Sequence, residues 1–372
     1  MIKIESIKKL RASTKKKIGI LIGLVVLYII MQLGCSFNFI GSQLKGLLVP
    51  ICYNIMLAVS LNVTVGILGE LSLGHAGFMC IGAFAGAFVV KYFNIVSADM
   101  TSWIVLPLAF LAAAVLAGIG GLIVGIPVLR LKGDYLAIVT LAFGEIFYNL
   151  FSVTRVAYDN GSLKMAIGGT DIKGLSLEAQ HIIEGPQGIK GDIRLDGKYG
   201  FTIAFVLMFI TVCIVLNFIH SRTGRAVKSI RDNRIAAESV GINITKYKLI
   251  ALVLSAAIAG VAGALYAFNS GMAEPTQSNY GYIMSINILV FVVLGGIGST
   301  MGSIIAAIIL TILPEWLRFL SDYRMLIYAL VLILMMLFNS NPVLNDFVNR
   351  VKKYITDFFK NLFLKKNKGE AK

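Results

Sequence analysis

The sequence predicts an all-α fold, a polytopic membrane bundle of about ten spans in which some helices are discontinuous at glycine-rich breaks. Hydrophobic residues make up 57% of the 372 residues and charged residues only 14%, whereas about a quarter of the residues of a soluble domain are charged. The mean hydropathy is +0.83. Apolar runs of the roughly 20 residues that cross a bilayer recur along the chain. We therefore expect one transmembrane domain over residues 18–338.

The apolar runs that could cross a membrane are 18–34, 44–66, 72–90, 102–129, 134–152, 201–219, 248–270, 279–297, 300–317 and 323–338. Residues 1–17, 220–248 and 350–372 carry net charges of +6, +5 and +6. Segments rich in Lys and Arg stay on the cytoplasmic side. Six runs precede the middle basic segment and four follow it, and both are even numbers of crossings. All three basic segments therefore fall on the same side, which predicts that both termini are on the cytoplasmic side of the cell membrane. Because the charge flanks the spans, we expect no nucleic-acid partner.

The basic tail 1–17 leads directly into the first apolar run, an arrangement that also begins secretory signal peptides. Cys35 would be the lipid-bearing residue of a lipoprotein, but Gln32 does not fit the motif that precedes such a cysteine. We therefore expect an uncleaved first helix. The chain has no Cys-x-x-Cys spacing, so the cysteines indicate neither a metal site nor a disulfide framework.

The first glycine-rich break, residues 62–77, contains four glycines and is hardly less apolar than the runs on either side of it. Irregular backbone at membrane depth is tolerated only where it lines a cavity or is buried in protein. We expect Ser72 to cap a helix that starts near Leu73, whose free N–H groups would favour a carboxylate. The candidate residues of a substrate pathway here are Glu70, Ser72, Gly74, His75 and Gly77.

Glu70 and His75 are the ionisable residues of this break. An ionised side chain at the bilayer centre costs about 2.5–3.5 kcal/mol, so the two residues mark either an aqueous path or a pair buried in protein. A position for Glu70 at the cytoplasmic end of a helix is the alternative. For His75 we expect a packed, hydrogen-bonded position, because the sequence lacks the second His of a metalloprotease motif.

The fifth apolar run contains Glu145, with Asn149 one helical turn later. Glu145 is expected to face the bundle interior and is a candidate for contact with solute. Asn149, and Asn287 in the eighth run, are expected to join helices by hydrogen bonds.

Residues 153–200 are placed outside the cell by this topology and contain six acidic and six basic residues. The dipeptides Asn160-Gly161 and Asp196-Gly197 are typical of tight turns, and residues 193–199 suggest a small hairpin. We expect an ordered extracytoplasmic loop that offers a docking surface to an extracytoplasmic partner.

Residues 222–242, between the sixth and seventh runs, have a helical pattern. Small apolar residues (Ala226, Ile230, Ala237 and Val240) are predicted on one face, and charged residues that include Arg225, Arg231 and Glu238 on the others. Gly241 is expected to end the helix. Such a ridge is typical of a helix that lies in a groove of another protein, whereas a helix on a lipid surface would carry bulkier residues. The chain has no Walker A motif, so any ATP would be bound by another chain.

The second glycine-rich break, residues 294–302, includes Gly295, Gly296 and Gly298. Its glycine spacing nearly matches that of the first break. Either the chain contains paired discontinuous helices of a repeated architecture, with these glycines in the substrate pathway, or the match is a coincidence. After the last run, residues 339–372 form a basic amphipathic tail that is expected to lie on the lipid of the inner leaflet.

Four stretches carry a resemblance to a known family: LSLGHAGFMCIGAFAGAF (71–88), LKGDYLAIVTLAFGEIF (131–147), RTGRAVKSIRDNRIAAESVGINITKYKLIALVLSAAIAGVAGALYA (222–267) and VVLGGIGSTMGSIIAAI (292–308). Together the chain resembles the LivM-type permease subunit of branched-chain amino-acid ABC importers. The resemblance implies that the loop 220–248 couples transport to a cytoplasmic ATPase through Arg225, Ile230, Arg231, Ala236, Ala237, Glu238 and Gly241. Arg234 and Ile235 stand where an acidic residue is usual.

The resemblance also implies a heterodimer with a LivH-type permease subunit, two ATPase subunits that bind the ATP, and an extracytoplasmic substrate-binding protein. This chain itself would hold no cofactor and would not be an enzyme. The expected function is import of branched-chain amino acids. An importer of urea or another small solute, and an ion-coupled secondary transporter, remain alternatives; the second leaves the loop unexplained. A passive channel would conduct without an ATPase, and the paired acids of an intramembrane enzyme are absent from the sequence.

Overall fold

A computed structural model describes residues 19–34, 41–96, 102–129, 134–159, 161–168, 179–191 and 199–318, and single positions at 172, 193, 195, 323, 326, 327, 329, 330 and 333. The chain divides into two compact units, Met1–Ile312 and Leu313–Lys372. The architecture below is that of the first unit. The basic tail 1–17, most of the tenth candidate span and the tail 339–372 lie outside the described residues.

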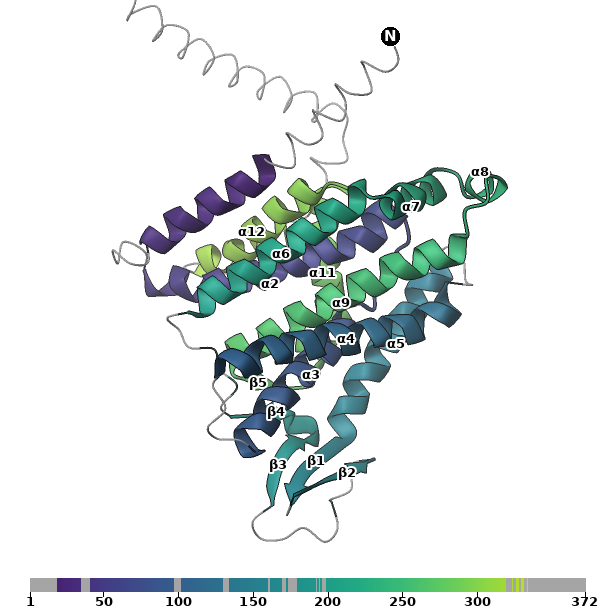
Figure 1. Ribbon diagram of the computed structural model, residues 1–372. Coiled ribbons are helices and arrows are strands. Elements are labelled where there is room, and N and C mark those ends of the chain that lie inside the picture. Colours follow the sequence, from purple (N-terminus) through teal and green to yellow (C-terminus); the bar gives the residue numbers. More distant parts are fainter. Residues whose placement is uncertain are drawn as a thin grey trace, which may run out of the picture. The chain divides into compact units, whose positions relative to one another are not determined.

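The described chain is mostly helical (Figure 1). The helices are Gly19–Gly34, α2 (Ser42–Asn62), the π-helix η1 (Val63–Leu68), α3 (His75–Val96), α4 (Ser102–Val128), α5 (Asp134–Val153), α6 (Gly200–His220), α7 (Arg222–Asp232), α8 (Arg234–Ser239), α9 (Ile244–Ser270), α10 (Gln277–Tyr280), α11 (Tyr282–Leu294) and α12 (Thr300–Trp316).

Among the described residues, seven helices are long and apolar enough to cross a membrane, and the helices Gly19–Gly34 and Thr300–Trp316 are apolar but shorter. These helices coincide with the apolar runs predicted between residues 18 and 317, within a few residues at each end. The chain is therefore a multi-pass membrane protein. The third helix begins later than predicted, at His75 rather than near Leu73.

Helix α9 packs against α2, α3 and α4, and glycines set how closely these helices approach. A Cβ atom added to Gly263 would lie 1.9 Å from the Met79 carbonyl oxygen, and one added to Gly82 would lie 2.1 Å from the Gly260 carbonyl oxygen. In a membrane, where lipid tails are as apolar as side chains, close packing of small residues is a main source of helix association. The close crossing of α3 and α9 therefore requires glycine at both positions, because a side chain at either one would collide with the backbone of the other helix.

The segment between α5 and α6 forms antiparallel sheets, so the expectation of an all-α chain is wrong there. Strands β1 (Thr154–Asp159), β2 (Ser162–Ile167) and β3 (Gln180–Glu184) have the order β2-β1-β3, and β4 (Ile189–Lys190) pairs with β5 (Met272–Ala273). The β1–β2 turn falls at the predicted Asn160-Gly161 dipeptide, where Gly161 has a φ of 82°. The predicted hairpin at 193–199 lies largely outside the described residues.

The sheets are fixed to the ends of α3 and α9 (Figure 1). Lys91 Nζ donates to the Lys190 carbonyl at 2.9 Å, and Leu195 N–H donates to the Phe268 carbonyl at 3.1 Å. The turn that precedes β4 is so close to β5 that a Cβ atom on Gly188 would lie 1.9 Å from the Ala273 carbonyl oxygen. The described part of this segment is therefore held by contacts with the helices as well as by its strands.

The α3–α9 contact yields a matched pair of variants. Gly263→Ala puts a methyl group against the Met79 carbonyl, and overpacking of this kind costs about 1–3 kcal/mol. Gly118→Ala on α4 meets no atom closer than 3.7 Å. We expect thermal unfolding in detergent to occur at a clearly lower temperature for the first variant and at an unchanged or slightly higher one for the second. Equal unfolding temperatures would contradict the packing described for α3 and α9.

Candidate functional site

The two glycine-rich breaks, far apart in sequence, lie against each other. Gly298 N–H donates a hydrogen bond of 2.9 Å to Asn62 Oδ1. A Cβ atom on Gly66 would lie 2.3 Å from the Gly298 nitrogen, so only glycine permits this approach. In the second break Gly296 and Gly298 have φ angles of 89° and 84°, and a Cβ on Gly295 would lie 2.5 Å from the Ser303 nitrogen. Nothing in the sequence predicted that the two breaks meet, or that Asn62 accepts a hydrogen bond from the second one.

The first break starts as a π-helix and continues as irregular chain. The π-helix η1 ends at Gly69, which has a φ of 81°, and Glu70 N–H bonds back to the Thr64 carbonyl at 3.2 Å. π-helical turns are rare and are frequent at functional sites. Residues 69–74 are neither helix nor strand, and α3 begins at His75.

A single side chain of α7 connects this helix to the first break. Arg231 Nη1 donates to the Gly66 carbonyl at 2.9 Å, which satisfies a backbone acceptor in the π-helix. The aliphatic part of the same side chain covers Gly69, where a Cβ atom would lie 2.6 Å from Arg231 Cγ. The predicted coupling residue Arg231 is thus in contact with the first break, which in turn packs on the second at Gly298.

Glu70 forms an ion pair with Lys248 in the second turn of α9. The two side chains are 17% and 8% exposed, so this is a largely buried pair. It joins the chain directly after η1 to the helix that follows α7 and α8. Glu70 therefore lies at the end of a helix, near the segment 222–242, and its partner is Lys248 rather than His75. Lys248 was not among the predicted site residues, and its one signal in the sequence is a charge within an apolar run.

The prediction that Ser72 caps the third helix is wrong. Residues 69–74 are irregular, so the helix starts three residues after Ser72, and Ser72 Oγ has no hydrogen-bond partner among the described residues. The Ala76 N–H donates instead to Ser285 Oγ of α11 at 3.1 Å, and the Leu73 N–H to Thr140 Oγ1 at 3.1 Å. These N–H groups are therefore already bound by side chains of the protein rather than free for a carboxylate.

The other residues predicted around this break are packed in the bundle. His75 is buried, and its Nε2 lies 2.8 Å from Ser60 Oγ, as expected for a hydrogen-bonded core histidine. A Cβ on Gly74 would lie 2.1 Å from the Thr140 carbonyl oxygen, and one on Gly77 would lie 2.6 Å from Gly144 Cα. Both glycines therefore allow α5 to approach α3.

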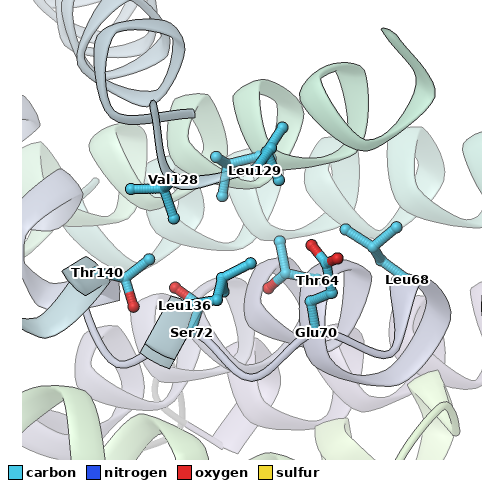
Figure 2. Close-up of a pocket in the computed structure, with 9 residues that line it drawn as sticks. Thr64, Leu68, Glu70, Ser72, Val128, Leu129, Leu136 and Thr140 are labelled. Atoms are coloured by element: carbon cyan, nitrogen blue, oxygen red, sulfur yellow. The ribbon is translucent and has the colours of Figure 1, made fainter. Parts of the chain in front are cut away.

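A small pocket adjoins the Glu70–Lys248 pair (Figure 2). Its empty space is about 240 Å³, open solvent included, and its lining residues come from η1, the irregular chain after it, α4, α5 and α9: Thr64, Leu68, Glu70, Ser72, Val128, Leu129, Leu136, Thr140 and Leu252. The buried atoms Glu70 Oε2 and Ser72 Oγ have no hydrogen-bond partner among the described residues. Figure 2 shows Glu70 and Ser72 on one side of the pocket, opposite Val128 and Leu129. The pocket suits a water or another small polar group.

Glu145 lies at the edge of the bundle rather than in its interior. Its side chain is partly exposed, and its Oε1 accepts a 2.7 Å hydrogen bond from the Tyr282 N–H at the start of α11. Carboxylates stabilise helix N-termini, so Glu145 fixes α11 to α5. Asn149 Nδ2 donates to the Glu145 carbonyl of its own helix at 2.8 Å, a bond within α5 rather than the interhelical bond expected for it.

The segment 222–242 forms two helices, and this divides the predicted apolar ridge. Asn233, with φ −155° and ψ 106°, ends α7 and caps α8 by accepting from the Ala236 N–H at 3.0 Å. The change of direction buries Ile230 and Ala237 in a small core with Ile244. The exposed apolar side chains are instead Ile235 (81%) and Val240 (75%). The prediction that Ile230 and Ala237 face a partner is therefore wrong.

The remaining predicted coupling residues are on the outside of this segment. Ala236 and Glu238 are exposed. Gly241, with a φ of 82°, ends α8 as predicted, with the Ile242 N–H bonded to the Ala237 carbonyl at 3.1 Å. Arg225 Nη1 donates to the His220 carbonyl at the end of α6 at 2.9 Å.

Lys228 on α7 lies among other charged side chains of this helix. Partial burial lowers the pKa of Lys228, the neighbouring Arg231 charge lowers it further, and Asp232 opposes both. Lys228 and Arg231 therefore repel each other, and Asp232 partly offsets this repulsion.

Comparison with known proteins gives a consistent family. The profile described as "Branched-chain amino acid transport system / permease component" matches residues 43–338. The permease protein LivM of a high-affinity branched-chain amino acid transport system is 34% identical over 296 residues, 78% of this chain and 67% of the relative, both in Salmonella typhimurium strain LT2 and in Escherichia coli K12. The permease protein LivH of E. coli K12 is 23% identical over 257 residues, 69% of this chain and 79% of the relative. No solved structure matches the chain.

Removal of one partner of the buried ion pair should destabilise the protein. Lys248→Met leaves the Glu70 carboxylate buried without a cation, which costs about 3–5 kcal/mol. We expect a large drop in thermal unfolding temperature in detergent, and recovery of most of it in the double variant Glu70→Gln/Lys248→Met. Lys246→Met, at an exposed position two residues away, should be nearly neutral. A Lys248→Met protein as stable as the Lys246→Met protein would show that the pair contributes little.

Proposed function

The chain belongs to the family of permease components of branched-chain amino acid transport systems, and from this we propose that it is the LivM-type permease subunit of an ATP-driven importer of leucine, isoleucine and valine. The identity to the LivM relatives, 34%, is higher than the 23% to the LivH relative, which supports the choice of subunit type. Within the part that the profile matches lie both breaks, Glu145 and the segment 222–242.

The proposed assembly has a LivH-type permease as the second membrane subunit. E. coli K12 has relatives of both kinds, LivM and LivH, which supports a pair of related but different permeases. Two ATPase subunits on the cytoplasmic side bind the ATP, because this chain has no Walker A motif. An extracytoplasmic binding protein delivers the substrate, and the sheets at the ends of α3 and α5 are its candidate docking surface.

The proposed topology has about ten spans, with both termini, α7 and α8 in the cytoplasm and the β-strands outside. The surplus of Lys and Arg in residues 220–248 supports this orientation. The helices interrupted at residues 69–74 and 295–299 are the proposed discontinuous helices of the bundle. The tail 339–372 is proposed to rest on the inner leaflet.

The observation that carries the coupling proposal is the contact of Arg231 with the first break, at Gly66 and Gly69. ATP-driven movement of the ATPase pair would shift α8 through Ile235 and Val240, and α7 moves with it because the two helices share a core. Arg231 would transmit the shift to Gly66 and its neighbours. The Glu70–Lys248 pair ties the same region to α9. A small displacement of α7 is thereby converted into a rearrangement of the breaks, which alternates access to the pathway.

The predicted pathway residues take different parts in this proposal. Glu145 is the candidate for substrate contact, whereas Glu70 and Ser72 line the pocket beside the coupling segment. Gly295, Gly296 and Gly298 provide a turn that can rearrange. Gly74, His75 and Gly77 hold α3 in its place beside α5 and α2.

The coupling proposal predicts that Ile235→Asp abolishes ATPase docking without unfolding the bundle, because the side chain is 81% exposed and makes no core contact. We expect the tagged variant to be purified with the second permease but without the ATPase, and leucine uptake to be lost. Ile167→Asp on β2, 57% exposed, is the matched control and should retain the ATPase.

Ala237→Trp would test ATPase docking less well than Ile235→Asp, because Ala237 is a buried residue of α8. A large side chain at that position would distort the segment 222–242. Normal ATPase recovery and uptake with Ile235→Asp would overturn the docking surface. Uptake that an uncoupler abolishes while ATP is constant would overturn the ATP-driven mechanism itself.

A further inference from the structure

Two adjacent helices, α5 and α11, carry polar side chains that are not buried within their membrane spans. Asn149 on α5 and Asn287 on α11 are exposed, and Glu145 on α5 is partly exposed. The helices are adjacent, since Glu145 Oε1 accepts from the Tyr282 N–H. Asn287 and the second carboxylate oxygen of Glu145 have no hydrogen-bond partner among the described residues.

The depth of these residues is given by the lengths of the helices. Glu145 is ten residues beyond Tyr135, the start of the span Tyr135–Val153, which is about 15 Å at 1.5 Å per residue. That is half of the roughly 30 Å hydrocarbon core of a bilayer. Asn287 precedes the end of its span, Leu294, by seven residues, which is about 10 Å. Lipid chains offer no partner for these groups at such depths, so the face is incomplete as it stands.

Apolar side chains flank the polar groups on both helices. Ile146 and Leu150 on α5 are 55% and 44% exposed, and Ile283 and Ile286 on α11 are 42% and 43% exposed. A second helical protein laid over this face would bury the flanks and leave the polar groups facing the space between the two proteins. Polar groups enclosed by apolar contacts are the arrangement that a solute path needs in a membrane.

Other segments of this chain fit the face less well. The apolar run 323–338 has its one cation, Arg324, at its start, whereas Glu145 lies near the middle of its own span. The rest of that run, 325–338, has one polar side chain, Tyr328, and offers neither a cation nor an amide to match Glu145. The helix Gly19–Gly34 is already packed on α6, where Tyr28 stacks on Phe205 with ring centroids 4.4 Å apart. A partner of the same fold remains, and this chain is similar to permeases of two kinds that occur in one organism.

We propose that α5 and α11 form the surface on which the second permease subunit lies, and that Glu145 binds the ammonium group of the amino acid that passes between the two subunits. This inference rests on the proposed function. A free amino acid carries an ammonium group, and the described part of this chain offers Glu145 no cation. Asn149 and Asn287 supply amide groups along the same path, for the carboxylate and for water.

The surface is tested with a photo-activated amino acid, p-benzoylphenylalanine, placed at Ile146 or Ile286 in the full complex in membranes. Ile123 on α4, 57% exposed, is the control position. We expect covalent adducts with the second permease from the first two positions and adducts with lipid alone from Ile123. Adducts within this chain, adducts with lipid alone at Ile146 and Ile286, or equal yields of the permease adduct at Ile123 would overturn the assignment.

The ammonium site is tested with Glu145→Gln, which keeps the Oε1 acceptor for the Tyr282 N–H and removes the charge. A hydrogen bond to a charged group is worth about 1.5–3 kcal/mol, so we expect the KM for leucine uptake to rise at least about tenfold. The maximal rate and the recovery of the second permease should change little, and Glu145→Asp should restore part of the affinity. Glu145→Ala, which also removes the acceptor, should in addition lower stability.

Two results would overturn the ammonium site. An unchanged KM with Glu145→Gln shows that the charge does not contact substrate. Loss of the second permease from the purified complex shows that Glu145 pairs with a cation of that subunit. A failure of the proposed function would be seen in a different measurement. The unaltered complex would then show no ATP-dependent leucine uptake, whichever adducts formed at Ile146.

Discussion

The hydrogen bond from Arg231 to the Gly66 carbonyl is the contact on which the arrangement around the two glycine breaks depends. A π-helix followed by irregular chain leaves backbone groups without helical partners, and such groups are costly where water is excluded. The chain satisfies them with side chains from distant segments. Arg231 donates to the Gly66 carbonyl, Asn62 accepts from the Gly298 N–H, and Ser285 accepts from the Ala76 N–H at the start of α3. Since one of these side chains belongs to α7, a rearrangement of the first break would change its contact with the segment 222–242.

The two carboxylates near the membrane interior differ in how their charge is compensated. Glu70 has its cation within the chain, because Lys248 lies beside it and both are largely buried. Its pair acts as a structural tie between the first break and α9. Glu145 has only a backbone N–H as partner and no cation among the described residues. The paired carboxylate ties two elements of the fold together, whereas the described residues supply no cation to Glu145.

The coupling segment shows how one residue decides which surface is available. Had residues 222–242 formed a single helix, Ile230 and Ala237 would have shared one face with Val240. Asn233 leaves the helical region and caps a new helix, which turns Ile230 and Ala237 toward Ile244 and leaves Ile235 outside. Ile230 and Ala237 of the predicted ridge therefore hold the two helices together, while Val240 of the ridge and its neighbour Ile235 stay exposed.

The sequence by itself determined the features that depend on local composition. Apolar runs of sufficient length located the helices, Asn160-Gly161 located the β1–β2 turn, and Gly241 located the end of α8, because hydrophobicity and backbone preference act over a few residues. The tertiary structure alone decided which groups meet. Ser72 lost the role of cap to Ser285, and Glu70 paired with Lys248, 178 positions away. Such pairings depend on how the helices pack. Helix packing is set by contacts between residues far apart in the chain, and these contacts leave no periodic or compositional pattern in the sequence.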